Sequence, residues 1–364
     1  MPSSDIPGRK REHLEVAAGP DVEAVGGPGW NDVHLVHEAL PRTDLAAVTL
    51  ETEFLGRRLR APLVIASMTG GHPDARPINA VLAGAAERHG LAMGVGSQRA
   101  ALWDASLAGT YAVARESAPG AFLIANLGAP QLVEQGEGPP TSAAELHRVV
   151  DMIEADALAI HLNFLEESVQ TGGDRRVAGL RDALAAAVSA SPVPTIAKET
   201  GAGLSRQSAL ELAGLGVAAL DVGGRGGTTF AAVEAIRARR HGDVRGAELG
   251  RVYRDWGIPT AVSVVGATAA GRPLIATGGV RSGLDAAKAL ALGATLVGVG
   301  RPLVRAARDG RQAVDAWIEQ FLEELRVAVF LSGSARVQDL RSAPRVILGD
   351  TRRWLEDLGY GRAG

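Results

Sequence analysis

Eight short apolar runs recur along this chain of 364 residues, and nearly every run ends in a polar or glycine-rich burst. The runs cover residues 62–67, 92–97, 121–126, 157–161, 194–198, 217–222, 273–277 and 294–299. Each run is almost continuously apolar, which is typical of strands buried on both faces of a parallel sheet. No other feature of the sequence limits the possible folds as strongly.

Alanine-rich stretches with helical periodicity lie between the runs. Examples are residues 75–89, 143–154, 178–189, 205–215 and 283–292. Strand–helix alternation repeated eight times predicts a (β/α)8 TIM barrel. An open doubly wound sheet is the alternative, but the even spacing of the units favours closure. In a barrel the polar bursts meet on one rim, which is where barrel enzymes carry their active sites.

We expect one domain with two appended segments. Residues 61–345 are predicted to form the barrel, and residues 305–345 to include a long amphipathic helix and its tail. Residues 1–60 are an N-terminal extension rich in proline, glycine and charge, and residues 346–364 are a C-terminal tail.

Composition excludes several classes of function. The chain has no cysteine, so disulfides, thiolate metal sites, iron–sulfur clusters and cysteine nucleophiles are excluded. A net charge of -3 and an aromatic content of 4% argue against nucleic acid as a partner. The first residues lack the apolar core of a secretory signal, and the apolar tract 286–304 is interrupted by Lys288, Arg301 and glycines. We therefore expect a cytoplasmic protein that binds neither nucleic acid nor membrane.

Two glycine–arginine segments follow the last two runs, GGVR at 278–281 and GVGR at 298–301. Loops in these positions usually form the phosphate site of a barrel. Glycine lets backbone N–H groups approach an anion, and arginine adds charge-assisted hydrogen bonds. The alternative is that these glycines only make tight turns. The glycine-rich loop at 223–228 lacks the context of a dinucleotide fingerprint, so a Rossmann fold is rejected.

Lys198 ends the fifth run, where its side chain is expected at the barrel mouth. It would form a Schiff base or stabilise an anionic cofactor ring; an ion pair, for example with Glu199, is the alternative. Arg99 and Asn126 also stand at strand ends, where they can bind a cofactor or a substrate. The basic cluster RKREH at 9–13 is, on sequence alone, most simply a solvated surface.

A polar segment follows the fourth run. His161 and Asn163 alternate along the chain and so share a face. The neighbouring carboxylates of Glu166 and Glu167 suit Mg²⁺ on a phosphate-bearing substrate. Without a metal, such a pair would raise one pKa and make one group a proton donor. An exposed acidic turn is the alternative.

Taken in order, these segments resemble the type 2 isopentenyl-diphosphate isomerase family. The matching motifs are RKREH, SMTGG, GSQRA, NLGA, HLN-x-x-E-E, GGD, AKETGAGLS, DVGGRGGTTF, TGGVRSG and LGATLVGVGRP. The series spans roughly residues 9–345. Each motif alone is weak, and the ordered series is specific.

The resemblance implies a (β/α)8 barrel that binds FMN, uses it in the reduced form, and requires Mg²⁺. Such an enzyme interconverts isopentenyl and dimethylallyl diphosphate without net redox change, and NAD(P)H serves only to reduce the flavin. Family members are homo-oligomers, often tetramers or octamers.

The resemblance also assigns residues. The flavin would be held by Ser67, Met68, Thr69, Ser97, Asn126, Lys198, Thr228, Gly278, Gly279, Arg281, Gly300 and Arg301. The substrate diphosphate would be held by Arg9, Lys10, Ser97, Gln98 and Arg99, so that the N-terminal extension contributes a phosphate clamp. His161 and Asn163 would lie beside the substrate, and Glu167 would bind Mg²⁺.

One departure from the family pattern concerns the chemistry. The family usually has glutamine where this chain has Glu166, and that glutamine lies close to the reacting alkene. An ionised Glu166 would stabilise a carbocation or act as a base, and a protonated Glu166 would be a general acid. The exchange leaves open a related FMN enzyme acting on another prenyl or phosphorylated substrate.

Two further alternatives stay open. An FMN-dependent α-hydroxy-acid oxidase would share the barrel and the phosphate loops. Its chemistry requires a histidine base near the sixth strand end, where this chain has DVGGR at 221–225 instead. A catalytically silent flavoprotein is the remaining alternative, suggested by the exchange at Glu166.

Overall fold

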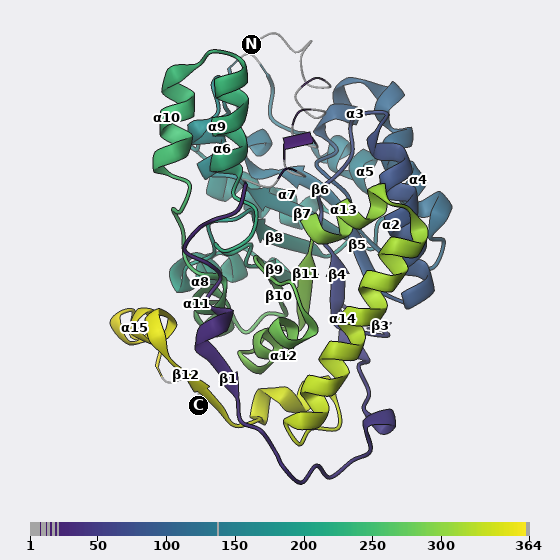
Figure 1. Cartoon of the computed structure of the whole chain (residues 1–364). Coiled ribbons are helices and arrows are strands. Elements are labelled where there is room, and N and C mark those ends of the chain that lie inside the picture. The colour runs from purple at the N-terminus through teal and green to yellow at the C-terminus, as the bar shows by residue number, and fades with distance from the viewer. Residues whose placement is uncertain are drawn as a thin grey trace.

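The computed structural model describes residues 8, 12, 15–16, 19, 22–136 and 138–361. Eight parallel strands close into a barrel with helices around it (Figure 1). The strands are β4 (Leu63–Ile65), β5 (Ala92–Gly94), β6 (Phe122–Gly128), β7 (Ala157–Leu162), β8 (Thr195–Glu199), β9 (Ala219–Asp221), β10 (Leu274–Thr277) and β11 (Leu296–Val299). β11 pairs with β4, which closes the barrel. Each of the eight apolar runs overlaps one of these strands, so the predicted (β/α)8 fold is confirmed.

The helices expected between the strands are also present. They are α2 (Ala75–His89), α5 (Ala143–Asp151), α7 (Leu180–Ala190), α8 (Arg206–Gly214) and α12 (Gly283–Ala291). Side-chain caps start several of them: Ser142 and Glu145 form a capping box at α5, and Ser282 caps α12. Such caps satisfy the unpaired N–H groups of the first turn, which fixes where each helix begins after its loop.

Further helices complete the outer ring. They are α3 (Arg99–Trp103), α4 (Gly109–Ser117), α6 (Phe164–Val169), α9 (Phe230–Arg240), α10 (Val244–Val252), α11 (Thr260–Ala267), α13 (Arg301–Arg308), α14 (Arg311–Leu331) and α15 (Gly349–Asp357). The helix α14 is the long helix expected in residues 305–345. In the part of the chain that the structure describes, none of the helices combines the length and the apolar content that crossing a membrane requires.

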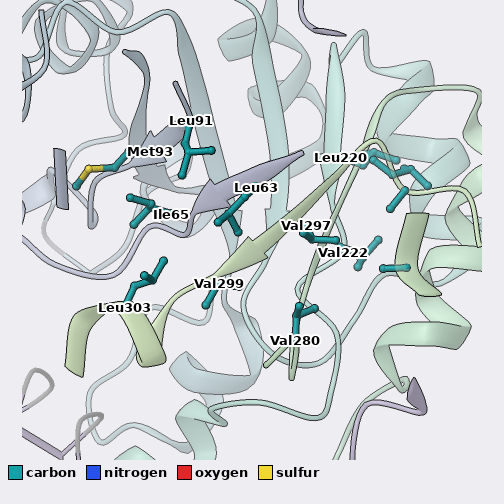
Figure 2. Packing of buried hydrophobic residues seen from close by; sticks show 14 of the residues in the cluster. Leu63, Ile65, Leu91, Met93, Leu220, Val222, Val280, Val297, Val299 and Leu303 are labelled. Carbon is teal, nitrogen blue, oxygen red and sulfur yellow. The ribbon is translucent and has the colours of Figure 1, made fainter. Parts of the chain in front are cut away.

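The strands bury both of their faces. Leu63 and Ile65 of β4 and Val297 of β11 pack in the layer between the barrel and its helices (Figure 2). Val64, between the two β4 residues, belongs to a separate cluster inside the barrel. Successive strand residues point to opposite faces. This double burial explains why the strand sequences are apolar throughout.

A hairpin closes the floor of the barrel, at the amino ends of the strands. It consists of β2 (Thr52–Phe54) and β3 (Arg57–Leu59). Phe54 belongs to the interior cluster and meets the ring of Phe122 edge to face, with centroids 5.8 Å apart. Part of the N-terminal extension thus seals one end of the barrel and leaves the other end open.

Two short strands, one from the N-terminal extension and one near the C-terminus, pair on the outside of the barrel (Figure 1). β1 (Val33–Leu35) pairs with β12 (Arg345–Ile347) in an antiparallel ladder. Val22 to Ala24 lie at the opposite end, against the loop after β9, where Glu23 forms a bridge with Thr228. This short arm therefore reaches the rim at the carboxyl ends of the strands.

Candidate active site

One cavity opens at the carboxyl ends of all eight barrel strands. Of the residues expected at the site, those lining it are Ser67, Met68, Thr69, Ser97, Arg99, Asn126, His161, Asn163, Glu166, Glu167, Lys198, Thr228, Gly278, Gly279, Arg281, Gly300 and Arg301. Gln98 is not among the lining residues. Arg9 and Lys10 lie outside the described residues. Segments distant in the sequence therefore converge on a single space.

The glycine loops after β9, β10 and β11 pack backbone against backbone. A Cβ on Gly278 would lie 2.3 Å from the carbonyl oxygen of Gly224, and one on Gly279 would lie 2.5 Å from that of Gly226. Both glycines also have positive φ, 128° and 64°. Only glycine tolerates such an approach together with this backbone conformation. Close packing of the loop backbones therefore requires glycine at both positions, and backbone atoms form this part of the cavity wall.

Two arginines of these loops point at one anionic group. Arg281 Nη2 and Arg301 Nη1 donate to the two carboxylate oxygens of Glu23, at 2.7 Å and 2.6 Å. Arg301 also begins α13, whose amino end adds a favourable field for an anion. Burial lowers the pKa of Arg301, and Glu23 opposes that shift. The arrangement has the charge pattern of a phosphate site, with a carboxylate in the position of the anion.

Lys198 lies in the cavity wall and is almost fully buried. Its ammonium group donates to the carbonyl oxygen of Glu199 at 2.9 Å and lies 3.7 Å from Asp221 Oδ2. Asp221 stands beside Lys198 on the neighbouring strand. Burial raises the pKa of Asp221, and the Lys198 ammonium opposes that shift. The ion pair holds a fixed positive charge in the wall of the cavity, which favours the electrostatic role over the Schiff base.

Glu199 supports the turn that follows Lys198. Its Oε2 accepts hydrogen bonds from the backbone N–H groups of residues 200, 201, 202 and 203, at 2.6, 2.7, 2.5 and 3.0 Å. Burial raises the pKa of this carboxyl to about 7, although these N–H groups and Lys198 act in the opposite direction. Glu199 is therefore not the ion-pair partner of Lys198 that the sequence allowed. Its side chain fixes the turn at residues 200–203, and its carbonyl oxygen accepts the hydrogen bond from Lys198.

His161 and Asn126 form one hydrogen-bonded unit across β6 and β7. Asn126 Nδ2 donates to the carbonyl oxygen of Val95 at 3.0 Å, so its Oδ1 is the acceptor for His161 Nδ1 at 2.9 Å. The network thus assigns the proton of the neutral ring to Nδ1 and leaves Nε2 as the acceptor. Both residues are held in one orientation at the cavity.

Asn163 links the two carboxylates of the acidic pair. Its Nδ2 donates to Glu166 Oε2 at 3.0 Å and to Glu167 Oε1 at 3.1 Å. Asn163 Oδ1 is buried without a partner among the described residues. All three side chains line the cavity, so the acidic pair is not an exposed turn. A shared amide donor brings two carboxylates together, and such a pair suits a hard cation such as Mg²⁺.

Gln98 points away from the cavity, unlike its neighbours Ser97 and Arg99. Its side chain is fully buried, its Nε2 donates to the carbonyl oxygen of Val149 at 2.8 Å, and its Oε1 accepts from Asn126 N at 2.9 Å. The expected contact with substrate is therefore replaced by a contact that fixes the backbone of Asn126. Arg225, in the loop after β9, does not line the cavity either. Its Nη1 donates to the carbonyl oxygen of Asp255.

Several side chains at the site were not anticipated from the sequence, and three of them are polar groups near the proposed anion sites. Glu23 and Gln131 line the cavity, and Asp174 bonds Arg99. Glu23 and Gln131 stand in segments without any motif. Asp174 ends the GGD segment, and a glycine pair before an acidic residue is the one signal that could have drawn attention to it.

The described residues contain no group of three or more histidine, cysteine, aspartate or glutamate side chains placed to hold a metal ion. A cation bound at Glu167 would therefore need ligands besides a cluster of acidic and histidine side chains, such as phosphate oxygens and water. Mg²⁺ is typically bound in this way, by one or two carboxylates together with substrate phosphates.

Comparisons with known proteins agree with this architecture. Residues 184–346 match the model of the family described as FMN-dependent dehydrogenase. Among solved structures, a mandelate oxidase variant with a monooxide FMN adduct has a TM-score of 0.61 and 22% sequence identity, covering 93% of this chain and 92% of that one. Another mandelate oxidase variant has a TM-score of 0.62 at 20% identity, covering 94% of this chain and 95% of that one. At this level of identity the likeness establishes the fold.

Sequence relatives are much closer. The isopentenyl-diphosphate delta-isomerase of Methanosarcina barkeri is 46% identical over 353 residues, covering 97% of this chain and 95% of that protein. The protein of the same name from Methanoregula boonei is 47% identical over 352 residues, with 96% of each chain covered. That from Archaeoglobus fulgidus is 45% identical over 351 residues, covering 96% and 99%. Identity of this extent over the whole chain, on an FMN-dependent barrel, places the chain in the type 2 isopentenyl-diphosphate delta-isomerase family.

Proposed function

We propose that this chain interconverts isopentenyl diphosphate and dimethylallyl diphosphate with the help of reduced FMN. The observation that carries the proposal is the single cavity that joins three features. These are the glycine–arginine phosphate site, the buried ammonium of Lys198, and the acidic pair held by Asn163. Family membership agrees with it.

The residues present fit an FMN molecule. The glycine wall has no room for a Cβ at Gly278 or Gly279, and Arg281 and Arg301 already converge on one anion. These residues, with Gly300 and Thr228, would hold the phosphate. Ser67, Met68, Thr69, Ser97 and Asn126 would contact the ring system, and Lys198 would stabilise negative charge on the reduced ring. When bound, reduced FMN supplies a ring nitrogen able to exchange a proton with an alkene carbon.

The reaction moves one double bond and needs no net redox change. A proton is added to the terminal methylene carbon of isopentenyl diphosphate, and a proton is lost from the methylene group on the other side of the branched carbon. Glu166 presents a carboxylate in the cavity, and we infer that it accepts or holds such a proton. Asn163 fixes Glu166 Oε2, and the His161–Asn126 unit forms the adjacent wall.

The diphosphate would be held away from the reacting alkene. Arg99 and Ser97 line the cavity and would bind it together with Arg9 and Lys10 of the N-terminal extension. Glu167 would hold Mg²⁺, which when bound would offset the negative charge of the diphosphate. Binding energy from a remote anchor lowers the barrier by positioning the alkene.

Several finer properties belong to the same proposal. NAD(P)H would serve as the reductant of the flavin, the chain would assemble as a homo-oligomer, in the form of a tetramer or an octamer, and the enzyme would act in the cytoplasm. The boundaries at 60 and 345 would separate the phosphate-clamp extension and the tail from the FMN-binding barrel.

A second candidate follows from Glu166, because the family pattern has an amide at this position. A related FMN enzyme acting on another prenyl or phosphorylated substrate would fit the same cavity. A screen of longer prenyl diphosphates and of monophosphates, under the conditions used for isopentenyl diphosphate, distinguishes the two candidates by the relative kcat/KM values.

Proton NMR tests the principal proposal. The purified protein is supplied with FMN, dithionite, Mg²⁺ and isopentenyl diphosphate in deuterated buffer. We expect dimethylallyl diphosphate to appear with deuterium incorporated, and no reaction when dithionite is omitted. Absence of both the new isomer and deuterium incorporation, in a protein that binds FMN, would refute isomerisation and leave flavin binding intact.

A further inference from the structure

Asp174 contacts both Arg99 and Glu167, the two residues proposed to hold the diphosphate and its cation. It ends a short turn at residues 170–174, which follows α6. Its side chain bonds Arg99, and its backbone bonds Glu167. Arg99 is the candidate for binding the anionic diphosphate, and Glu167 is the candidate for binding its cation.

The side chain of Asp174 fixes the guanidinium group of Arg99. Asp174 Oδ2 accepts from Arg99 Nη1 at 2.5 Å and from Gln131 Nε2 at 3.0 Å, and both charged side chains are only 17% exposed. On its other side the guanidinium lies 4.6 Å from the ring centroid of Trp103. Arg99 Nε is buried and has no partner among the described residues. The arginine is thus held in place while donor capacity remains for a ligand.

The backbone of Asp174 fixes the carboxylate of Glu167. Asp174 N donates to Glu167 Oε2 at 2.8 Å, and Asn163 Nδ2 donates to Glu167 Oε1 at 3.1 Å. Each carboxylate oxygen therefore receives a hydrogen bond from a different element of the fold. Donors of this kind orient a carboxylate that binds a metal ion.

Gly173 makes this backbone contact possible. A Cβ at Gly173 would lie 2.1 Å from the carbonyl oxygen of Glu167 and 2.9 Å from its Cα. These are backbone atoms, which cannot move aside as the end of a flexible side chain would. Arg175 Nε donates to the same carbonyl oxygen at 2.9 Å and binds the turn to α6 from the other side. The turn is therefore pressed against Glu167, and glycine is the residue that permits it.

We propose that Gly173 and Asp174 are positioning residues that set the separation between Arg99 and Glu167 for a diphosphate ester carrying a divalent cation. The Asp174 side chain aligns the group that binds the anion, and the 173–174 backbone aligns the group that binds the cation. This inference rests on the proposed function for the identity of the ligand. One turn would thus set the separation between two side chains that follow the ends of different strands.

Calorimetric titration of inorganic diphosphate into the FMN-loaded protein, with and without Mg²⁺, tests the inference without any turnover. Asp174→Asn keeps the shape of the side chain and the backbone N–H group. We expect it to bind diphosphate roughly 10-fold more weakly both with and without Mg²⁺, because Arg99 loses its charged anchor. Gly173→Ala should instead lose most of the tightening that Mg²⁺ produces, because the backbone contact with Glu167 is displaced.

Asp182→Asn is the matched control, since it makes the same charge change at an exposed residue in the first turn of α7. It should bind diphosphate as the unmodified protein does. Asp174→Glu, which restores the charge, should recover part of the affinity. In steady-state kinetics Asp174→Asn should raise KM by about the same factor and leave kcat within roughly twofold.

Diphosphate binding to Asp174→Asn that equals or exceeds that of the unmodified protein would overturn the role of the side chain. An undiminished Mg²⁺ effect in Gly173→Ala would overturn the role of the backbone. The expected binding pattern in a protein that does not isomerise isopentenyl diphosphate would refute the proposed function alone. Isomerisation together with unaltered diphosphate binding in the variants would refute this inference alone.

Discussion

At the scale of single residues, Glu166 is the position where the proposed proton transfer can be tested directly, because this chain has a carboxylate where the family pattern has an amide. Glu166→Gln preserves the shape of the side chain and leaves an oxygen for the hydrogen bond from Asn163 Nδ2, but the side chain can no longer take up a proton. We expect the variant to isomerise at least about 100-fold more slowly, which is the usual contribution of a general acid or base. The rate of deuterium incorporation measures this effect. An unchanged rate would show that Glu166 carries no proton in the reaction.

Glu199 gives a prediction about pH and stability. Burial raises its pKa in the folded protein to about 7, above the ordinary value of 4.5, so the folded state binds this proton more tightly than the unfolded chain does. The resulting stability is present in full below about pH 4.5 and is lost as the pH rises through 7. Urea unfolding at pH 5 and pH 8 should therefore show a larger fall for the unmodified protein than for Glu199→Gln. The difference should be on the order of 3 kcal/mol, and parallel pH profiles would contradict the prediction.

At the scale of elements, loops that pack backbone to backbone build the candidate phosphate site. The strand β10 ends at Thr277, and Gly278 follows with φ 128° and its Cβ position 2.3 Å from the carbonyl oxygen of Gly224. Gly278→Ala must therefore push apart the loops that follow β9 and β10. We expect FMN to bind at least about tenfold more weakly, a loss of roughly 1.4 kcal/mol, as measured by quenching of flavin fluorescence.

Two controls belong with that variant. Riboflavin lacks the phosphate, so Gly278→Ala should change its binding much less than that of FMN. Gly214→Ala, at the end of α8, places a Cβ where nothing lies within 4 Å and should leave FMN binding unchanged. Equal losses for FMN and riboflavin would mean that the loop supports the ring system and not the phosphate.

The position of each residue relative to the strand ends explains which parts of the site were predictable. A residue at the carboxyl end of a barrel strand must lie at the rim, so Lys198, His161 and Arg301 could be placed from sequence alone. Glu23 and Gln131 come from segments without a motif, and Asp174 comes from a turn beyond α6; their positions depend on tertiary packing. Gln98 shows a second limit, because consecutive loop residues at a strand end can point in opposite directions. The sequence supplies no period from which to tell which one faces the cavity.

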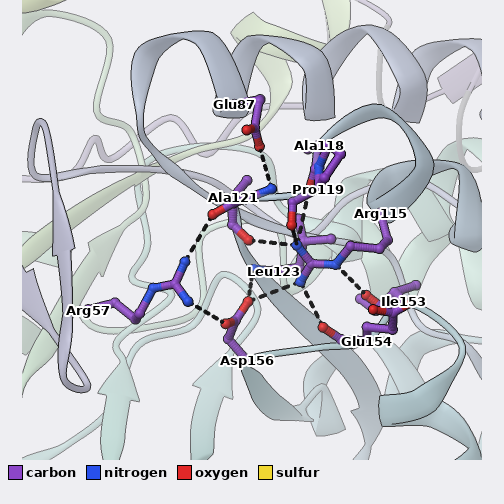
Figure 3. A network of polar contacts seen from close by, with 11 residues as sticks. Arg57, Glu87, Arg115, Ala118, Pro119, Ala121, Leu123, Ile153, Glu154 and Asp156 are labelled. Atoms are coloured by element: carbon purple, nitrogen blue, oxygen red, sulfur yellow. Dashed lines mark hydrogen bonds and ion pairs between the residues drawn. The ribbon is translucent and has the colours of Figure 1, made fainter.

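At the scale of the whole molecule, we expect chemistry and stability to be separated between the two ends of the barrel. The functional cavity lies at the carboxyl ends of the strands, whereas a polar network lies at the amino ends of β6 and β7 (Figure 3). In that network Arg115 donates to Asp156 Oδ2 at 3.1 Å and to the carbonyl oxygens of residues 118, 119, 121, 153 and 154. Asp156 also accepts from the backbone N–H of Leu123 at 2.9 Å. One arginine thus joins α4 to the starts of two strands.

This division predicts that stability and cofactor binding can be changed separately. Arg115→Met leaves several carbonyl groups without their donor and removes the more buried of the two arginines that bond Asp156, in a place that is only 16–20% exposed. Breaking such a pair should lower the free energy of unfolding by about 3 kcal/mol, while the Kd for FMN stays unchanged. Arg57→Met is the matched control: Arg57 bonds the same carboxylate at 3.4 Å, but its side chain is 50% exposed, so the loss should be below about 1 kcal/mol. Chemical unfolding and flavin titration of both variants check the prediction, and a parallel loss of FMN affinity in Arg115→Met would show that the two ends are coupled through the strands.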